Sequence, residues 1–340
     1  MQKIIDRVFL FSIATIIAFF GIAVFVFPTK SFSEKENRAL SSAPELTLKS
    51  ITDGRYFSEL GDFYSDQFPL RDVFTSAYAI TELSLGKRES NGIIYGKKDT
   101  LIARPKGNTQ KAQKNINAIR ALENVALYIP PSSAQVFNSR LPLIYPKQQN
   151  EKTQANSEEL YYRTDHHWTT EGAYMAYQEI CHDLGIEAYG KKYFTAQTVN
   201  DSFRGTSFSR SGLPAAMIAP DSIVLYRYEG DEEYEIKNHE NGERQKGFYS
   251  FDALNSADKY RVFLGGNYSH LSISKGTDRP KLLLIKDSFA NSAVPFLALH
   301  FDIEMIDPRY CTRSYLEEQV SRKDIDRILF LISEDTLGEI

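Results

Sequence analysis

The chain opens with one long apolar segment and afterwards alternates between apolar runs and amphipathic stretches. Residues 8–27, VFLFSIATIIAFFGIAVFVF, contain no charge and reach the roughly 20 residues that a helix needs to cross a membrane. Lys3 and Arg7 precede them, and positive flanks stay on the cytoplasmic side. A signal peptide would have a shorter apolar region and a small-x-small cleavage site, which residues 24–29 lack. We expect a single-pass cell-membrane anchor with its N-terminus inside and the main domain extracytoplasmic.

Beyond this anchor, the apolar pattern predicts alternating strands and helices. Such alternation indicates an α/β fold with a mostly parallel sheet that is covered on both faces. Residues 195–250 are rich in Ser, Gly, Tyr and charge, and we interpret them as a β-rich insertion. Residues 91–96 and 101–103 are expected to form a hairpin or two short strands. Further strands are expected at residues 125–129, 223–226, 260–264, 281–285, 303–306 and 328–332, and helices at 63–87, 108–124, 173–184, 289–300 and 315–321.

The predicted organisation has three parts. Residues 1–30 form the membrane anchor, residues 31–88 a linker with a helical lead-in, and residues 89–340 one domain that includes the insertion. The length of 340 residues, 42% of them hydrophobic, is sufficient for one large domain with such attachments.

Charge and cysteine content exclude several classes of protein. With 40 basic and 44 acidic residues, the chain lacks the basic balance of a nucleic-acid-binding protein. Cys181 and Cys311 supply neither a disulfide framework nor a cysteine-based zinc site, although a single bridge between them stays open. The remaining histidines show no metal-motif spacing, so we expect no metal and no other cofactor; they are His182, His239, His270 and His300.

The first candidate for chemistry is the segment KLLLIKDSF, in which an apolar strand leads directly into Asp287 and Ser288. A serine at a turn from strand to helix is lifted out of the sheet, where it is placed like a nucleophile. Backbone N–H groups at such a turn can stabilise an oxyanion. The ordinary alternative is that Asp287 or Ser288 only caps the helix.

The second candidate is TDHHWTTEG, residues 164–172. If this segment is extended, Asp165 and His167 point to one side and His166 points to the other. A carboxylate beside an imidazole fixes its tautomer and leaves the second nitrogen to accept a proton from a serine. Trp168 is expected to pack and hold the loop. A polar cap before the following helix is the alternative.

Two further places follow predicted strands. Gly266 lets the backbone approach a ligand, and Asn267 can donate a hydrogen bond to a developing negative charge. An ordinary turn explains the same two residues. Arg309 could hold an acyl or saccharide oxygen, or it could form a surface salt bridge.

Together these motifs resemble the DHHW protein family, which is related to the SGNH-hydrolase-like domains of alginate O-acetyltransferase proteins. The resemblance is carried by TDHHWTTEGAY (164–174), FLGGN (263–267), IKDSF (285–289) and, more loosely, IDPRY (306–310). The stretches SEKENRAL and DQFPLRD near the N-terminus also match.

The resemblance implies a three-layer α/β/α fold of flavodoxin-like type with Ser288, His167 and Asp165 as a catalytic triad. Beside this triad, Gly266, Asn267, Arg309 and Trp168 are the predicted oxyanion-stabilising or substrate-binding residues. In the related alginate proteins, this domain works outside the membrane with a membrane-bound O-acyltransferase that supplies the acyl group, and the acceptor is an exported polysaccharide. A serine O-acetyltransferase or carbohydrate acetylesterase is therefore the function expected here.

Two departures from the family pattern keep a second function open. Lys286 stands where SGNH hydrolases have glycine, and residues 131–159 are short and polar where another strand and helix are expected. The alternative is a catalytically inactive, glycan-binding surface protein of the same fold. The letters DHH alone suggest a metal-dependent phosphoesterase, but that class needs additional aspartates for two metal ions and works in the cytoplasm.

Overall fold

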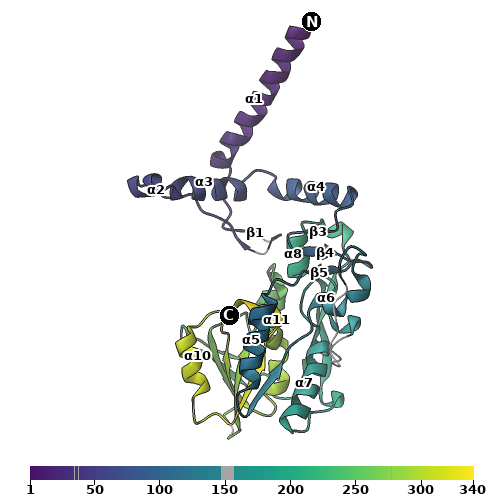
Figure 1. Ribbon diagram of the computed structural model, residues 1–340, viewed down its shortest axis with the longest axis vertical. Coiled ribbons are helices and arrows are strands. Elements are labelled where there is room, and N and C mark those ends of the chain that lie inside the picture. Colours follow the sequence, from purple (N-terminus) through teal and green to yellow (C-terminus); the bar gives the residue numbers. More distant parts are fainter. Residues whose placement is uncertain (34, 37, 147–156, 277) are drawn as a thin grey trace. The chain divides into compact units, whose positions relative to one another are not determined.

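The computed structural model describes residues 1–33, 35–36, 38–146, 157–276 and 278–340 (Figure 1). The chain divides into two compact units, which are described separately. The first comprises Met1–Lys87 with Gly212–Pro214, and the second comprises Arg88–Ser211 with Ala215–Ile340.

The first unit is built around α1 (Gln2–Val26), which is long and apolar enough to cross a membrane. Near an N-terminus, a signal sequence meets the same measure. The single helix predicted at residues 63–87 is two helices, and the break between them contains Pro69, whose ring is incompatible with a helix interior. The other elements are β1 (Phe32–Ser33), β2 (Arg38–Ala39), α2 (Leu48–Thr52), α3 (Arg55–Asp66) and α4 (Arg71–Ser84).

The two N-terminal motifs of the family resemblance contact each other inside this unit. Arg38 of SEKENRAL forms an ion pair with Asp66 of DQFPLRD, and Arg71 forms one with Glu36. The carboxylate of Asp66 also accepts a hydrogen bond from the Ser41 backbone at 2.9 Å. These charges therefore tie the segment that follows α1 to the ends of α3 and α4.

The second unit contains a sheet of seven described strands in the order β10-β9-β11-β13-β12-β14-β6. Four of them, β13, β12, β14 and β6, are parallel, whereas β10, β9, β11 and β13 pair antiparallel. The strands are β6 (Val125–Tyr128), β9 (Glu235–Asn238), β10 (Arg244–Lys246), β11 (His270–Ser274), β12 (Lys281–Lys286), β13 (Asp302–Ile306) and β14 (Arg327–Leu331).

The sheet is therefore mixed, and the prediction of a mostly parallel sheet is wrong. Strands β9 and β10 come from residues 195–250 and extend the main sheet through antiparallel pairing. Within the same stretch, β7 (Thr195–Phe203) and β8 (Asp221–Arg227) form a separate two-stranded ribbon. Residues 147–156 of the short segment at 131–159 lie outside the described residues.

Helices cover both faces of the main sheet. One core joins the sheet to α7 (Thr170–Leu184) and α9 (Val294–Leu297) and includes Trp168 and Leu284. The other joins it to α5 (Thr109–Arg120), α10 (Arg313–Val320) and α11 (Glu334–Glu339). Figure 1 shows α5 and α11 side by side. Both cysteines are free: Cys181 lies in the first core and Cys311 borders the second.

Smaller elements complete the second unit and bring two corrections. Residues 260–264, predicted as a strand, form a 3-10 turn at Lys259–Val262 and then a left-handed residue, Leu264, with φ 62°. The helix predicted at residues 289–300 is a 3-10 turn at Ser288–Ser292 followed by the short α9. The remaining elements are a three-stranded sheet of β3 (Glu89–Ser90), β4 (Ile93–Tyr95) and β5 (Leu101–Ala103), with α6 (Ser133–Val136) and α8 (Thr206–Ser211).

Replacing Leu284 of the central strand β12 by alanine tests the assignment of the core. The side chain is fully buried, so we expect the free energy of unfolding to fall by about 2–5 kcal/mol. Urea denaturation of the full chain in detergent measures this change. The matched control is Leu143→Ala, because Leu143 is 97% exposed and its loss should cost at most about 0.5 kcal/mol. Equal losses in the two variants would contradict the assignment.

Candidate active site

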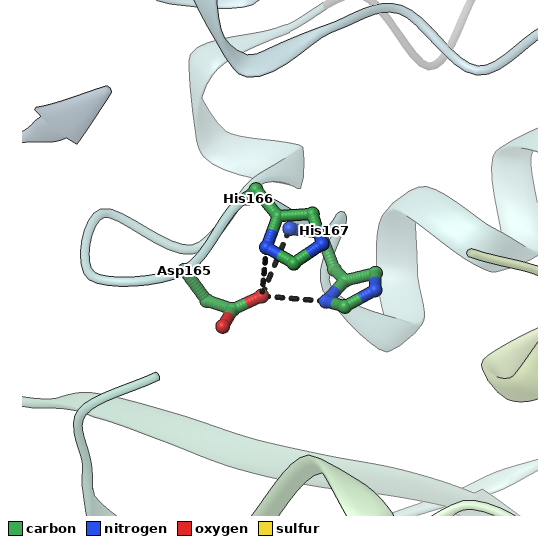
Figure 2. Close-up of side chains that lie close together, drawn as sticks. All are labelled: Asp165, His166 and His167. Carbon is green, nitrogen blue, oxygen red and sulfur yellow. Dashed lines mark hydrogen bonds and ion pairs between the residues drawn. The ribbon is translucent and has the colours of Figure 1, made fainter. Parts of the chain in front are cut away.

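Asp165 and His167 meet through a turn of the chain (Figure 2). Asp165 Oδ1 accepts one hydrogen bond from the His167 backbone N–H at 3.0 Å and lies 2.6 Å from His167 Nδ1. A side chain that accepts from the backbone two residues later closes an Asx turn. The predicted juxtaposition therefore occurs, but not through an extended segment. His166 does not point away, because its Nδ1 lies 3.6 Å from the same carboxylate oxygen and its ring contacts that of His167.

The second oxygen of Asp165 is held by a segment that the sequence analysis did not single out. Thr206 donates its backbone N–H to Asp165 Oδ2 at 2.6 Å. Gly205 packs so closely that an added Cβ would lie 2.1 Å from Asp165 Oδ2 and 2.5 Å from Asp165 Cβ. Only glycine fits at position 205 without displacing the carboxylate.

Ser288 completes a chain of hydrogen bonds. It follows β12, its side chain is half-buried, and its Oγ lies 2.8 Å from His167 Nε2. Asp287 acts as the helix cap, since its Oδ1 accepts from the Phe289 backbone N–H at 3.0 Å. Its Oδ2 accepts from the Ser333 backbone N–H at 2.8 Å. Asp287 therefore provides the cap, and the Ser288 hydroxyl faces the imidazole of His167.

Burial and neighbouring charges act in opposite directions on Asp165. Burial by itself raises the pKa of this carboxyl group, whereas His166, His167 and the hydrogen bonds from His167 lower it. The net pKa lies below the ordinary value, so the group is a carboxylate at neutral pH. It therefore accepts the Nδ1 proton of His167 and leaves Nε2 as the acceptor that faces Ser288.

Aromatic side chains fix the position of the His167 ring. Tyr260 stacks on it with a centroid distance of 4.0 Å and an interplanar angle of 5°, and Phe289 approaches it edge-on at 5.0 Å. The buried Tyr260 hydroxyl lies 3.1 Å from Ser292 Oγ. Tyr260 was missed from the sequence because it was assigned to a strand, and no periodic signal marks a ring that packs against a distant histidine.

Trp168 joins the two halves of the site from inside the core. Its indole N–H donates to the Phe289 carbonyl and to Ser292 Oγ, both at 3.0 Å, and its side chain is fully buried. These partners lie in the turn that begins with Ser288. We therefore assign Trp168 a positioning role in place of the substrate contact predicted from the sequence.

A buried ammonium organises the region around the GGN turn. Lys286 Nζ donates to Asn267 Oδ1 and to Asn291 Oδ1, both at 3.0 Å, and it lies 3.4 Å from Asp307 Oδ2. The amide of Asn291 in turn donates to Asn267 Oδ1 at 3.1 Å. Asn267 Oδ1 therefore accepts from two donors, which fixes the orientation of the exposed Asn267 amide.

The other two predicted residues lie at the border of this network. Gly266 has a φ of 138°, a backbone conformation that favours glycine, and its carbonyl oxygen lies 3.4 Å from Asn291 Nδ2. Arg309 binds the buried carboxylate of Asp307 through two nitrogens, at 2.9 and 2.6 Å. Its pair with Asp307 is thus half-buried, unlike the surface salt bridge considered from the sequence.

The Asp165, His166 and His167 side chains also group three metal-ligating atoms within 4.8 Å. His167 Nε2 faces Ser288 Oγ at 2.8 Å, and Asp165 Oδ1 faces His167 Nδ1 at 2.6 Å. A cation here would have to replace both hydrogen bonds. The arrangement therefore fits proton transfer between serine and histidine better than metal binding.

Comparison with known proteins confirms the resemblance to the DHHW family. The sequence profile of the DHHW protein family matches residues 144–306, a segment that holds the Asp165–His167 turn, Gly205 and Ser288. None of the curated proteins matches the chain significantly in sequence.

Solved structures match over most of the chain. A DHHW family protein from Eubacterium siraeum is 19% identical, with a TM-score of 0.57 over 74% of this chain and 93% of that one. Bacillus cereus PatB1, solved with a sulfonyl adduct, is 18% identical, with a TM-score of 0.53 over 72% of this chain and 95% of that one. The O-acetyltransferase domain of Pseudomonas putida AlgJ is 12% identical, with a TM-score of 0.42 over 73% and 93%. The first two show a shared mixed α/β fold.

Replacing Lys286 by methionine tests whether the buried ammonium makes the stability of the chain depend on pH. Burial lowers the pKa of Lys286 to about 8, whereas an unfolded chain has a lysine pKa of about 10.4. The unfolded chain binds this proton more tightly than the folded chain does. Burial of the ammonium therefore lowers the free energy of unfolding by its full amount below pH 8, and this loss becomes smaller as the pH rises from about 8 to about 10. We expect the stability of the unmodified chain, relative to Lys286→Met, to rise over this window.

Urea denaturation at several pH values measures this difference. The control is Lys192→Met, which changes an exposed lysine and should show no such rise. A pH-independent difference between the unmodified chain and Lys286→Met would contradict the assignment.

Proposed function

We propose that this chain is a serine O-acetyltransferase or carbohydrate acetylesterase that acts outside the cell membrane on an exported or cell-surface polysaccharide. The observation that carries the proposal is the continuous hydrogen-bonded chain from Asp165 through His167 to Ser288, at 2.6 and 2.8 Å. Such an arrangement activates a serine hydroxyl for attack on an acyl carbon. The resemblance to the DHHW family indicates that the transferred group is acetyl and that the acceptor is a polysaccharide.

In the proposed first half-reaction, Ser288 Oγ gives its proton to His167 Nε2 and attacks the carbonyl carbon of an acetyl ester. The tetrahedral intermediate collapses, and the leaving alcohol takes the proton from His167 Nε2. In the second half-reaction, His167 Nε2 takes the proton of a sugar hydroxyl as its oxygen attacks the acetyl carbon, and then gives that proton to Ser288 Oγ as the bond to the serine breaks. When water is the acceptor, the same steps amount to hydrolysis. Asp165 stabilises the imidazolium that forms in each half-reaction.

Two groups are proposed to stabilise the oxyanion. The backbone N–H of Ser288 donates to no group among the described residues, so it is available beside the nucleophile. The amide of Asn267 accepts through Oδ1 from Lys286 and Asn291, which leaves its N–H₂ group to donate. In this proposal Lys286, in the position of the hydrolase glycine, orients the amide of Asn267, and Gly266 provides close backbone approach.

The proposal also includes the layer architecture of the second unit and the location of the protein in the cell. The second unit would be a three-layer, SGNH-hydrolase-like domain of residues 89–340, joined by residues 31–88 to an anchor in residues 1–30. Support for the anchor comes from the uncharged residues 8–27 and from Lys3 and Arg7 before them. A membrane-bound O-acyltransferase is the proposed acyl donor. In this scheme Arg309 binds an acyl or saccharide oxygen with the part of its guanidinium that Asp307 does not occupy.

The triad is tested by covalent labelling of the full chain in detergent. We expect phenylmethanesulfonyl fluoride, or 4-nitrophenyl acetate as acyl donor, to modify Ser288, because a sulfonyl or acetyl group is transferred to an activated serine oxygen. Ser288→Ala should abolish the adduct, and His167→Ala or Asp165→Asn should slow labelling by about three to four orders of magnitude. Peptide mass spectrometry identifies the modified residue.

Ser314→Ala is the matched control, since Ser314 is an exposed serine of α10 and its loss should leave the labelling unchanged. An unlabelled Ser288 in a folded chain would reject the triad and favour the inactive, glycan-binding alternative.

Asn267→Ala tests the proposed oxyanion donor. Loss of one such donor lowers the rate of the chemical step by about 10²–10³-fold. We therefore expect Asn267→Ala to slow turnover of 4-nitrophenyl acetate by about that factor through kcat, with little change in KM. Asn255→Ala removes an exposed asparagine as the control. A change in KM alone would indicate that Asn267 binds substrate without stabilising the transition state.

A further inference from the structure

A second cluster of metal-ligating side chains lies on the antiparallel part of the main sheet. His239 directly follows β9, His270 begins β11 and Glu304 lies in β13. These strands are adjacent in the order β9-β11-β13. The residues are far apart in sequence and show no metal-motif spacing, and the strand order brings them together.

The register of the strands brings the three side chains together. The His239 backbone N–H donates to the His270 carbonyl oxygen at 3.1 Å, so the two histidines are cross-strand neighbours. Glu304 is paired with Ser272, two residues after His270, and residues two apart in a strand share one face. The three side chains therefore project from the same region of one face.

The distances suit a shared cation. His270 Nε2 lies 2.8 Å from Glu304 Oε2, and the rings of His239 and His270 stack at 4.0 Å with an interplanar angle of 11°. One ligand atom from each residue lies within 4.8 Å of the other two. His239 is exposed, and its Nε2 lies 3.0 Å from Ser272 Oγ, so one side of the cluster is open to solvent.

Other side chains orient these ligands. Tyr315 of α10 places its hydroxyl 2.7 Å from His270 Nδ1, a contact that fixes the ring and can accept the Nδ1 proton. Hydrogen bonds of this kind from outside the ligand set orient ligating histidines in metal sites. Arg322 approaches Glu304 Oε1 at 3.5 Å, but it is bound more closely by Asp324, at 2.8 Å. The arginine contact is made by Oε1 of Glu304, whereas His270 contacts Oε2.

The chemistry of the three side chains selects the class of cation. Two imidazoles and one carboxylate suit zinc and related transition metals, whereas Ca²⁺ and Mg²⁺ prefer oxygen ligands alone.

We propose that His239, His270 and Glu304 form a divalent transition-metal site of the zinc class, with water as the remaining ligand, that ties β9, β11 and β13 together. On binding, the single ring proton of His270 moves from Nε2, where it is shared with Glu304, to Nδ1, which then donates it to the Tyr315 hydroxyl oxygen, so no net proton is released. The cation takes the place of the shared proton between Nε2 and Oε2. The site is separate from the serine chemistry and does not depend on it.

The proposal is tested on the metal-free full chain in detergent, without an affinity tag that contains histidine. Titration with Co²⁺, followed by its visible absorption, and competition with Zn²⁺ should show saturation at one equivalent. We expect His239→Ala and Glu304→Gln each to weaken binding by at least about tenfold. Zn²⁺ should also raise the midpoint of thermal unfolding in the unmodified chain and not in these variants.

Two control variants separate this site from other histidines. His182→Ala removes an exposed histidine, and His166→Ala removes one from the Asp165–His167 turn; neither should change the affinity. The proposal fails if the unmodified chain shows no saturable binding. It also fails if His166→Ala abolishes binding, or if His239→Ala and Glu304→Gln bind as the unmodified chain does. His239 is exposed, so its replacement leaves the core intact and keeps the test decisive.

Discussion

The arrangement of the candidate site depends on one buried carboxylate. Asp165 is almost inaccessible to solvent, yet it stays ionised because backbone and ring N–H groups from two segments surround it. A buried charge of this kind is stable only when its hydrogen-bonding capacity is filled. The turn at residues 165–167 and the backbone at Gly205 and Thr206 therefore depend on each other. Removing either set of donors leaves the Asp165 carboxylate partly unsatisfied. Because a Cβ at position 205 would displace this carboxylate, the position is restricted to glycine although no periodic signal in the sequence marks it.

A second buried charge serves a different purpose. Lys286 is fully buried at the end of β12, between two parallel strands, and its ammonium group contacts two asparagines and Asp307. An ammonium has three donors and no acceptor, so every group around it must present an oxygen. The amides of Asn267 and Asn291 consequently have one orientation each. Where the SGNH hydrolases have a glycine, the ammonium group of Lys286 thus fixes the orientation of these two amides.

The sequence predicted the parallel half of the sheet well, because β12 holds a continuous buried apolar run and β14 a nearly continuous one, and β13 keeps Ile303, Met305 and Ile306 buried. It missed β9 and β11, whose polar residues, such as Lys237, His270 and Ser272, hide a strand that pairs antiparallel near the edge. The juxtaposition of Asp165 and His167 was expected from spacing, but the local geometry that produces it is an Asx turn. Tyr260, Gly205 and Asn291 could not be found from the sequence, because each matters through contacts with residues that are distant along the chain.

The separation of the serine and the histidine along the chain matters during synthesis. His167 and Ser288 are separated by 121 positions, and the strand that precedes the serine pairs with β13 and β14, which follow it in the chain. During synthesis from the N-terminus, the imidazole–carboxylate pair therefore has no serine partner until β12 has been added. In the proposed mechanism, a chain cut short before β12 would lack the nucleophile.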